Sequence, residues 1–200
     1  MPGDRRKGSE NAFVRDLRDL QGRLELALRP LPVHARDLRE DVASVLRRAV
    51  LSEVLRNGEY DVANLLRLSE GTPSDTGTVF TLTGGPKEFA RPTVSVNARE
   101  HFVRDDDAVI HFALTLRERH DIPLELIAYG FEIYFPSKEP IWFVRFDLNK
   151  RGDENAEFGL RSHLHPGHED LQLPSPLLSP VEALNFVLYR CRLHRGVSRT

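Results

Sequence analysis

Hydrophobic residues in the first third of the chain recur at helical spacing. One apolar stripe runs from Phe13 to Leu28 and a second from Leu38 to Val54, each with charged residues on the opposite face. The pattern predicts helices over residues 10–28, 36–57 and 59–68. We therefore interpret residues 1–70 as a helical N-terminal part.

The pattern changes after residue 70, where turn-forming residues precede a series of strand-like runs. Apolar and polar residues then alternate with the period of a strand over residues 79–83, 93–97, 109–117, 125–135, 140–148 and 157–165. The connections between the later runs are short and contain no helical stretch, which favours an antiparallel meander. Ser179, Pro180 and Glu182 combine an N-cap, a first-turn proline and a capping-box glutamate, and so predict a final helix.

These elements predict an α+β protein. We expect N-terminal helices, a central antiparallel sheet of five or six strands, and a C-terminal helix packed on one sheet face. The helical part would cover residues 1–70 and the sheet with its closing helix residues 71–200. A chain of 200 residues suits one compact domain that contains both parts.

Composition narrows the classes of function. The formal net charge of −2 excludes a global basic field for holding nucleic acid. The single cysteine, Cys191, excludes an internal disulfide framework. A membrane span needs about eighteen consecutive apolar residues, and the sequence contains no such run. The turn Gly84-Gly85-Pro86 lacks the ending of a phosphate-binding loop. We expect a cytoplasmic protein with no membrane contact and no cofactor.

Histidines and carboxylates concentrate in residues 162–170, directly after a strand-like run. Strand alternation would place His163 and His165 on one sheet face, and Arg145 and Asp147 on the same face if the strands neighbour in order. The opposite face carries rows of apolar residues and should form the core. Those rows comprise Ile110, Phe112, Leu114 and Leu116, then Tyr129, Phe131, Ile133 and Phe135, then Trp142, Val144 and Phe146, and finally Phe158, Leu160 and Leu164.

The polar face suggests acid and base chemistry on a phosphodiester. His163 and His165 would transfer protons while Asp147 orients one of them, and Arg145 and Arg161 would bind the phosphate oxygens. RNA is then the candidate substrate, and no metal is required. The competing interpretation is that an antiparallel sheet with one solvated face is polar there for that reason alone.

A second chemical interpretation treats the histidine cluster as a metal site. His163, His165 and His168, with Glu169 or Asp170, are residue types that bind metal ions, and the two strand histidines project together. The spacing from His163 to Glu169 resembles the first ligand motif of the cupin family. No later strand carries that family's second histidine motif.

The segments Trp142–Asp147 and Arg161–His165, followed by an amphipathic helix, resemble the TumE-type toxins of bacterial toxin–antitoxin pairs over residues 125–190. The resemblance implies a cytoplasmic protein with an antiparallel sheet that an inhibitor partner holds inactive. It also implies that Arg145, Asp147, His163 and His165 are the positions to test.

A hypothesis of another class makes the chain a non-catalytic interaction module. Amphipathic helices and open sheet edges bind other proteins when nothing within the chain covers them. We therefore expect a protein partner, either an inhibitor or the other subunits of a complex, beside the candidate RNA.

Overall fold

A computed structural model describes residues 30–86, 97–136, 141–153 and 160–192, together with the single positions Arg15, Asp19, Asn155 and Phe158. The helix predicted over residues 10–28 and the strand predicted over 93–97 lie almost entirely outside the described residues.

The described part is an α+β structure, as the sequence predicts. Its helical elements are α2 (Ala35–Leu51), α3 (Glu59–Leu65), α5 (Pro180–Asn185) and a π-helical turn, η1 (Phe186–Arg190). Its strands are β1 (Leu66–Glu70), β2 (Thr78–Gly84), β3 (Phe102–Val103), β4 (Val109–Arg119), β5 (Ile122–Tyr134), β6 (Phe143–Leu148), β7 (Ser162–Pro166) and β8 (Leu173–Pro174). The sheet therefore has eight strands rather than five or six, in the order β1-β2-β4-β5-β6-β7-β8, with β3 also paired to β4. All pairs are antiparallel.

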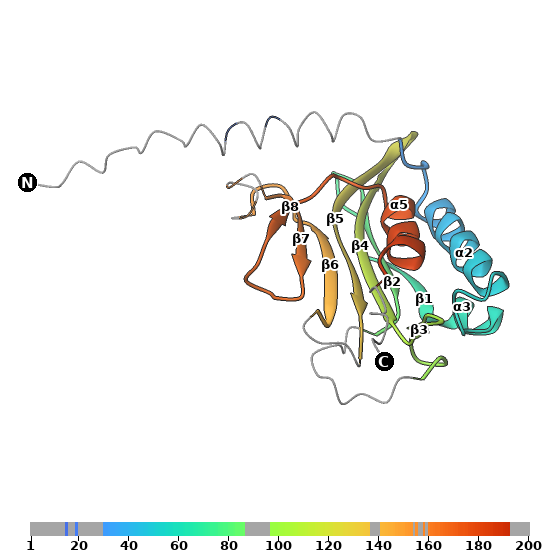
Figure 1. Cartoon of the computed structure of the whole chain (residues 1–200). Coiled ribbons are helices and arrows are strands. Elements are labelled where there is room, and N and C mark those ends of the chain that lie inside the picture. Colours follow the sequence, from blue (N-terminus) through green and yellow to red (C-terminus); the bar gives the residue numbers. More distant parts are fainter. Residues whose placement is uncertain are drawn as a thin grey trace, which may run out of the picture.

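Helices α2 and α5 pack against each other over one face of the sheet (Figure 1). The buried residues of both layers form one cluster, which includes Leu38, Val42 and Leu46 of α2, Leu82 of β2, Phe112 and Leu114 of β4, Phe131 of β5 and Leu184 of α5. Within it the rings of Phe112 and Phe131 stack with their centroids 5.4 Å apart. The core thus lies between the helices and the sheet, and the opposite sheet face carries the polar residues.

The prediction that a helix continues to residue 68 is wrong. Residues 66–70 form β1, which pairs with β2 from Leu66 opposite Gly84 to Glu70 opposite Phe80. Short apolar runs fit either period, and here pairing with a neighbouring strand decides the structure. Gly84 is required on β2 because an added Cβ would lie 2.2 Å from the ring of Phe112.

Two aromatic residues assigned to the core rows do not belong to it. Trp142 is 39% exposed and Phe158 is 60% exposed. Trp142 precedes β6, and its indole N–H donates a hydrogen bond to the carbonyl of Gly167 at 2.9 Å. Tyr134 and Phe143 pair across β5 and β6 and are buried in a small separate cluster with Val109, which gives the polar face an apolar patch at one end.

The final helix begins where the sequence predicts. Ser179 is its N-cap, Pro180 its first residue, and the side chains of Ser179 and Glu182 form the expected capping box. Among the residues that the structure describes, no helix is long and apolar enough to cross a membrane.

A fully buried arginine fixes the end of that helical segment. Arg104 follows β3, and its guanidinium donates to the carbonyls of Val187 and Cys191, both at 2.7 Å. The same group binds Asp106 through two hydrogen bonds of 2.8 and 2.7 Å. These contacts satisfy carbonyls that a helix C-terminus leaves without partners.

Candidate functional site

The register of β5, β6 and β7 places polar residues side by side on the sheet face away from α2 and α5. On β6, Asp147 lies opposite His163 of β7 and Gly130 of β5, while Arg145 lies opposite His165. An added Cβ at Gly130 would lie 3.1 Å from Oδ1 of Asp147, so glycine leaves room for the carboxylate. Pairing along two strands therefore builds the site.

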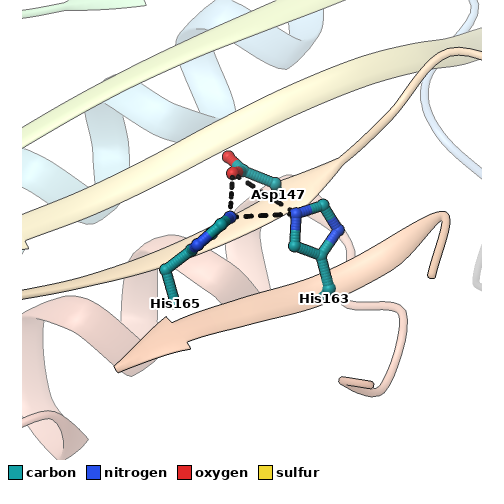
Figure 2. A group of neighbouring side chains, drawn as sticks. All are labelled: Asp147, His163 and His165. Atoms are coloured by element: carbon teal, nitrogen blue, oxygen red, sulfur yellow. Dashed lines mark hydrogen bonds and ion pairs between the residues drawn. The ribbon is translucent and has the colours of Figure 1, made fainter. Parts of the chain in front are cut away.

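Three side chains of this group converge on one point (Figure 2). The Nε2 atoms of His163 and His165 are 3.0 Å apart. Oδ2 of Asp147 lies 3.3 Å from Nε2 of His165 and 3.7 Å from Nε2 of His163. Two imidazole nitrogens and one carboxylate oxygen thus face one another across less than 4 Å.

The tautomer of His163 follows from its other ring nitrogen. Nδ1 lies 2.8 Å from the carbonyl of Leu160, which can only accept a hydrogen bond, so Nδ1 carries the hydrogen. Burial lowers the pKa of His163, the attraction of Asp147 and the Leu160 carbonyl oppose this, and His165 and Arg145 add to the lowering. The neutral ring then presents the lone pair of Nε2 to the site.

The orientation of His165 depends on the same site. Its Nδ1 is buried and has no hydrogen-bond partner within the part of the chain that the structure describes. Its Nε2, by contrast, faces both Asp147 and His163. The polar contacts of the His165 ring are therefore made through the nitrogen that points into the site.

Arg145 holds the carboxylate from the side. Its Nε donates to Oδ2 of Asp147 at 2.7 Å, and its two terminal nitrogens bind the carboxylate of Glu169 at 2.9 and 2.8 Å. Its Nη1 also lies 3.9 Å from the carboxylate of Glu132. Hydrogen bonding to Arg145 lowers the pKa of Glu169 despite the opposing effect of its partial burial. Arg145 is thus a link between a site residue and an exposed turn.

The residues that the sequence singles out separate into two groups. The structure brings together Asp147, His163 and His165, with Arg145 beside them. Nε of Arg161 donates to the carbonyl of Asn149 at 3.1 Å, at the start of β7. His168, the third histidine of the expected ligand set, instead accepts a hydrogen bond from the backbone N–H of Asp170, and its side chain is 68% exposed.

The metal-ligand set expected from the sequence therefore changes. Among the described residues, the group of three or more ligand side chains close enough to share an ion consists of Asp147, His163 and His165, whose ligand atoms lie within 4.8 Å of one another. Glu169 binds Arg145 instead. Gly167, with φ of +86°, turns the chain between the strand histidines and His168.

Sequence reasoning missed Gly130 as a neighbour of the site, and strand alternation placed Glu132 on the polar face without giving it a role. Both lie on β5, which the sequence places only as a strand, and neither belongs to a motif. Knowledge of the strand order would have identified them, because Gly130 pairs with Asp147 and Glu132 with Arg145.

In comparisons of the chain with models of protein families, with curated proteins and with solved structures, no match was found.

Proposed function

We propose that Asp147, His163 and His165 bind one divalent metal ion of the zinc type. The supporting observation is the set of three distances between their ligand atoms, 3.0, 3.3 and 3.7 Å. Ligands placed about 2.0 Å from a tetrahedral zinc ion lie roughly 3.3 Å from one another. The three atoms are therefore already spaced as three corners of a zinc coordination shell.

The surroundings of the ligands support this assignment. The Nδ1–H of His163 donates to a backbone carbonyl, which is the usual way in which a metal-binding histidine is oriented. Arg145 holds the ligand oxygen of Asp147 and is itself neutralised by Glu169. The two imidazoles and the carboxylate provide the nitrogen and oxygen donors that zinc accepts.

Three protein ligands leave a fourth position for water or substrate, which is the arrangement of catalytic rather than structural zinc sites. Zinc bound there would lower the pKa of a coordinated water toward neutrality and so supply a nucleophile for hydrolysis. Gly130 pairs with the half-buried Ala113 beside Asp147, so this part of the polar face carries only small side chains.

Burial favours an ion over direct proton transfer to a large substrate. The side chains of His163 and His165 are only 2% and 3% exposed. A nucleic-acid phosphodiester would have to reach both rings to use them as acid and base, because proton transfer needs hydrogen-bond distance. An ion between the three ligand atoms needs no such access.

The test is metal content and affinity of the purified chain. We expect one zinc ion per chain. Loss of a residue that only orients a metal ligand weakens binding by about 10- to 100-fold. Asp147→Asn, His163→Ala and His165→Ala each remove a ligand and should weaken zinc binding by more than that. His168→Ala is the matched control, since it removes a neighbouring exposed histidine and should leave affinity unchanged. A wild-type chain without stoichiometric binding of zinc or cobalt would refute the proposal.

Metal-free cleavage of RNA or another phosphodiester by His163 and His165 is the second candidate. It is favoured by the 3.0 Å distance between the Nε2 atoms of His163 and His165, which places a base beside an acid, and by the resemblance to TumE-type toxins. Incubation with RNA separates the two. Cleavage that survives a chelator but not the change of both histidines to alanine would favour the metal-free mechanism.

A further inference from the structure

A cavity lies at the other end of the sheet from Asp147, His163 and His165. Its volume is about 450 Å³, and it lies where β1 and β2 meet the end of α3 and the turn before β3. It is lined by Asn64, Leu65, Arg67, Thr83, Gly85, Pro86, Arg99, Glu100 and His101. This volume falls within the range of small-molecule sites, about 300 to 1,000 Å³.

The two arginines of this cavity form no ion pair within the described ranges, unlike several other arginines. Arg56, Arg104 and Arg145 each bind a carboxylate. Arg67 and Arg99 have no ion-pair partner within the described ranges, although Glu100 also lines the cavity. Two guanidinium groups and one carboxylate give the cavity a net positive charge.

The other polar side chains of the cavity supply hydrogen-bond donors. Arg67 pairs with Thr83 across β1 and β2, so both side chains project from the same sheet face. Neither the Thr83 hydroxyl nor the Asn64 amide makes a side-chain hydrogen bond within the described residues, and both line the cavity. Guanidinium, hydroxyl and amide groups are together the donor set of an oxyanion site.

We propose that this cavity binds a small molecule through its phosphate group. The guanidinium forks of Arg67 and Arg99 match the oxygens of a phosphate, and Thr83 and Asn64 supply further donors. Leu65 and Pro86 provide apolar contacts for the organic part of the ligand. The ligand class is a phosphorylated metabolite or mononucleotide.

The cavity and the metal centre share one row of the sheet. Strand pairing aligns Arg67 with Thr83, Ala113, Gly130 and Asp147. Four strand spacings of about 4.8 Å separate the backbones at the two ends by roughly 19 Å. At this separation the two sites bind their ligands independently, and phosphate binding does not require that the metal centre exist.

Calorimetric titration of the full chain with inorganic phosphate, pyrophosphate and ADP tests the proposal. We expect saturable binding that Arg67→Gln with Arg99→Gln weakens at least about tenfold, because two charge-assisted contacts are lost. Arg48→Gln is the matched control, since Arg48 is an exposed arginine of α2 outside the cavity. Asp147→Asn should leave phosphate binding unchanged, which separates this test from that of the metal centre.

Two results would overturn the proposal. One is wild-type protein that binds none of the three phosphates, and the other is a double arginine variant that binds them as tightly as the Arg48→Gln control. Circular dichroism of each variant shows that it is folded. Binding of ADP but not of inorganic phosphate would identify the ligand as a nucleotide. Equal binding of both would identify it as a simple phosphate. Either result supports the site.

Discussion

Arg104 and Arg145 each lie at the centre of a cluster of polar groups, and the two clusters have different roles. Arg104 is fully buried and divides its donors between Asp106 and the last carbonyls of the C-terminal helical segment. Arg145 is 23% exposed and divides its donors between Asp147 and Glu169.

The difference lies in what each cluster leaves over. Around Arg104, one guanidinium group donates to all the carbonyl and carboxylate oxygens of the cluster, and these bonds fix the end of the C-terminal helical segment. Around Arg145, the same kind of pairing holds Asp147 while its Oδ2 still faces two imidazole nitrogens. The converging atoms of Asp147, His163 and His165 are able to bind a ligand. The fully paired groups around Arg104 stabilise the fold instead.

The largest expected effect is on stability, through Arg104. Arg104→Met leaves the partly buried Asp106 and the carbonyls of Val187 and Cys191 without their donor, so the free energy of unfolding should fall by about 3 to 5 kcal/mol. Urea denaturation measures it. Arg56→Met breaks an ion pair between exposed side chains and should cost less than about 1 kcal/mol. Equal losses in both variants would contradict a structural role for Arg104.

A smaller effect, on binding rather than folding, is expected at Arg145. Arg145→Met removes the 2.7 Å hydrogen bond that holds Asp147, and zinc affinity should fall by about 10- to 100-fold. Zinc titration against a chromogenic chelator measures the change. Arg48→Met is the control because Arg48 is an exposed arginine of α2 and lies outside the site. Wild-type affinity in Arg145→Met would show that strand packing alone positions Asp147.

The smallest expected effect is a pH dependence of stability that belongs to the Arg104 cluster. Burial raises the pKa of Asp106, but hydrogen bonding and attraction from Arg104, with the Ala108 N–H and Arg192, outweigh it and lower that pKa overall. The unfolded chain therefore takes up this proton at higher pH than the folded chain does. The stabilisation is present above the usual carboxyl range and is lost as pH falls through the folded pKa.

Urea midpoints between about pH 3 and pH 7 would measure this dependence. Asp106→Asn should lower stability at neutral pH and flatten its decline toward acid relative to wild type. Identical slopes in the two proteins would show that Asp106 titrates with the same pKa in the folded and unfolded chain.

The sequence predicts the fold class because local pattern and tertiary structure agree over most of the chain. Strands β2, β4, β5 and β6 and the start of α5 lie where alternation and capping place them. The two-residue strands β3 and β8 are not predicted, and the clearest exception is β1, a five-residue strand that follows α3 without a break. Nothing local separates it from a last helical turn, and only its pairing with β2 makes it a strand.

The candidate site is predictable only in part. Alternation puts His163 and His165 on one face, and Asp147 joins them because β6 and β7 are adjacent, which the sequence suggests but does not establish. His168 belongs to the same run of histidines in the sequence, but its exposed side chain does not join the site because the turn at Gly167 redirects the backbone. The role of Arg104 at the C-terminal helical segment carries no sequence signal, since the Val187 and Cys191 carbonyls that it binds are 83 and 87 residues away along the chain.

All three proposed ligands come from one hairpin, between residues 147 and 165, near an edge of the sheet that the two-residue strand β8 completes. Strands near the edge of a sheet, with few packed neighbours, open locally at a lower free energy than strands of the core. An ion held across β6 and β7 would therefore act as a local staple, and metal removal should first raise amide hydrogen exchange in these strands while the core under α2 stays protected. The hairpin is also a portable unit, since grafting one short segment transfers the whole ligand set.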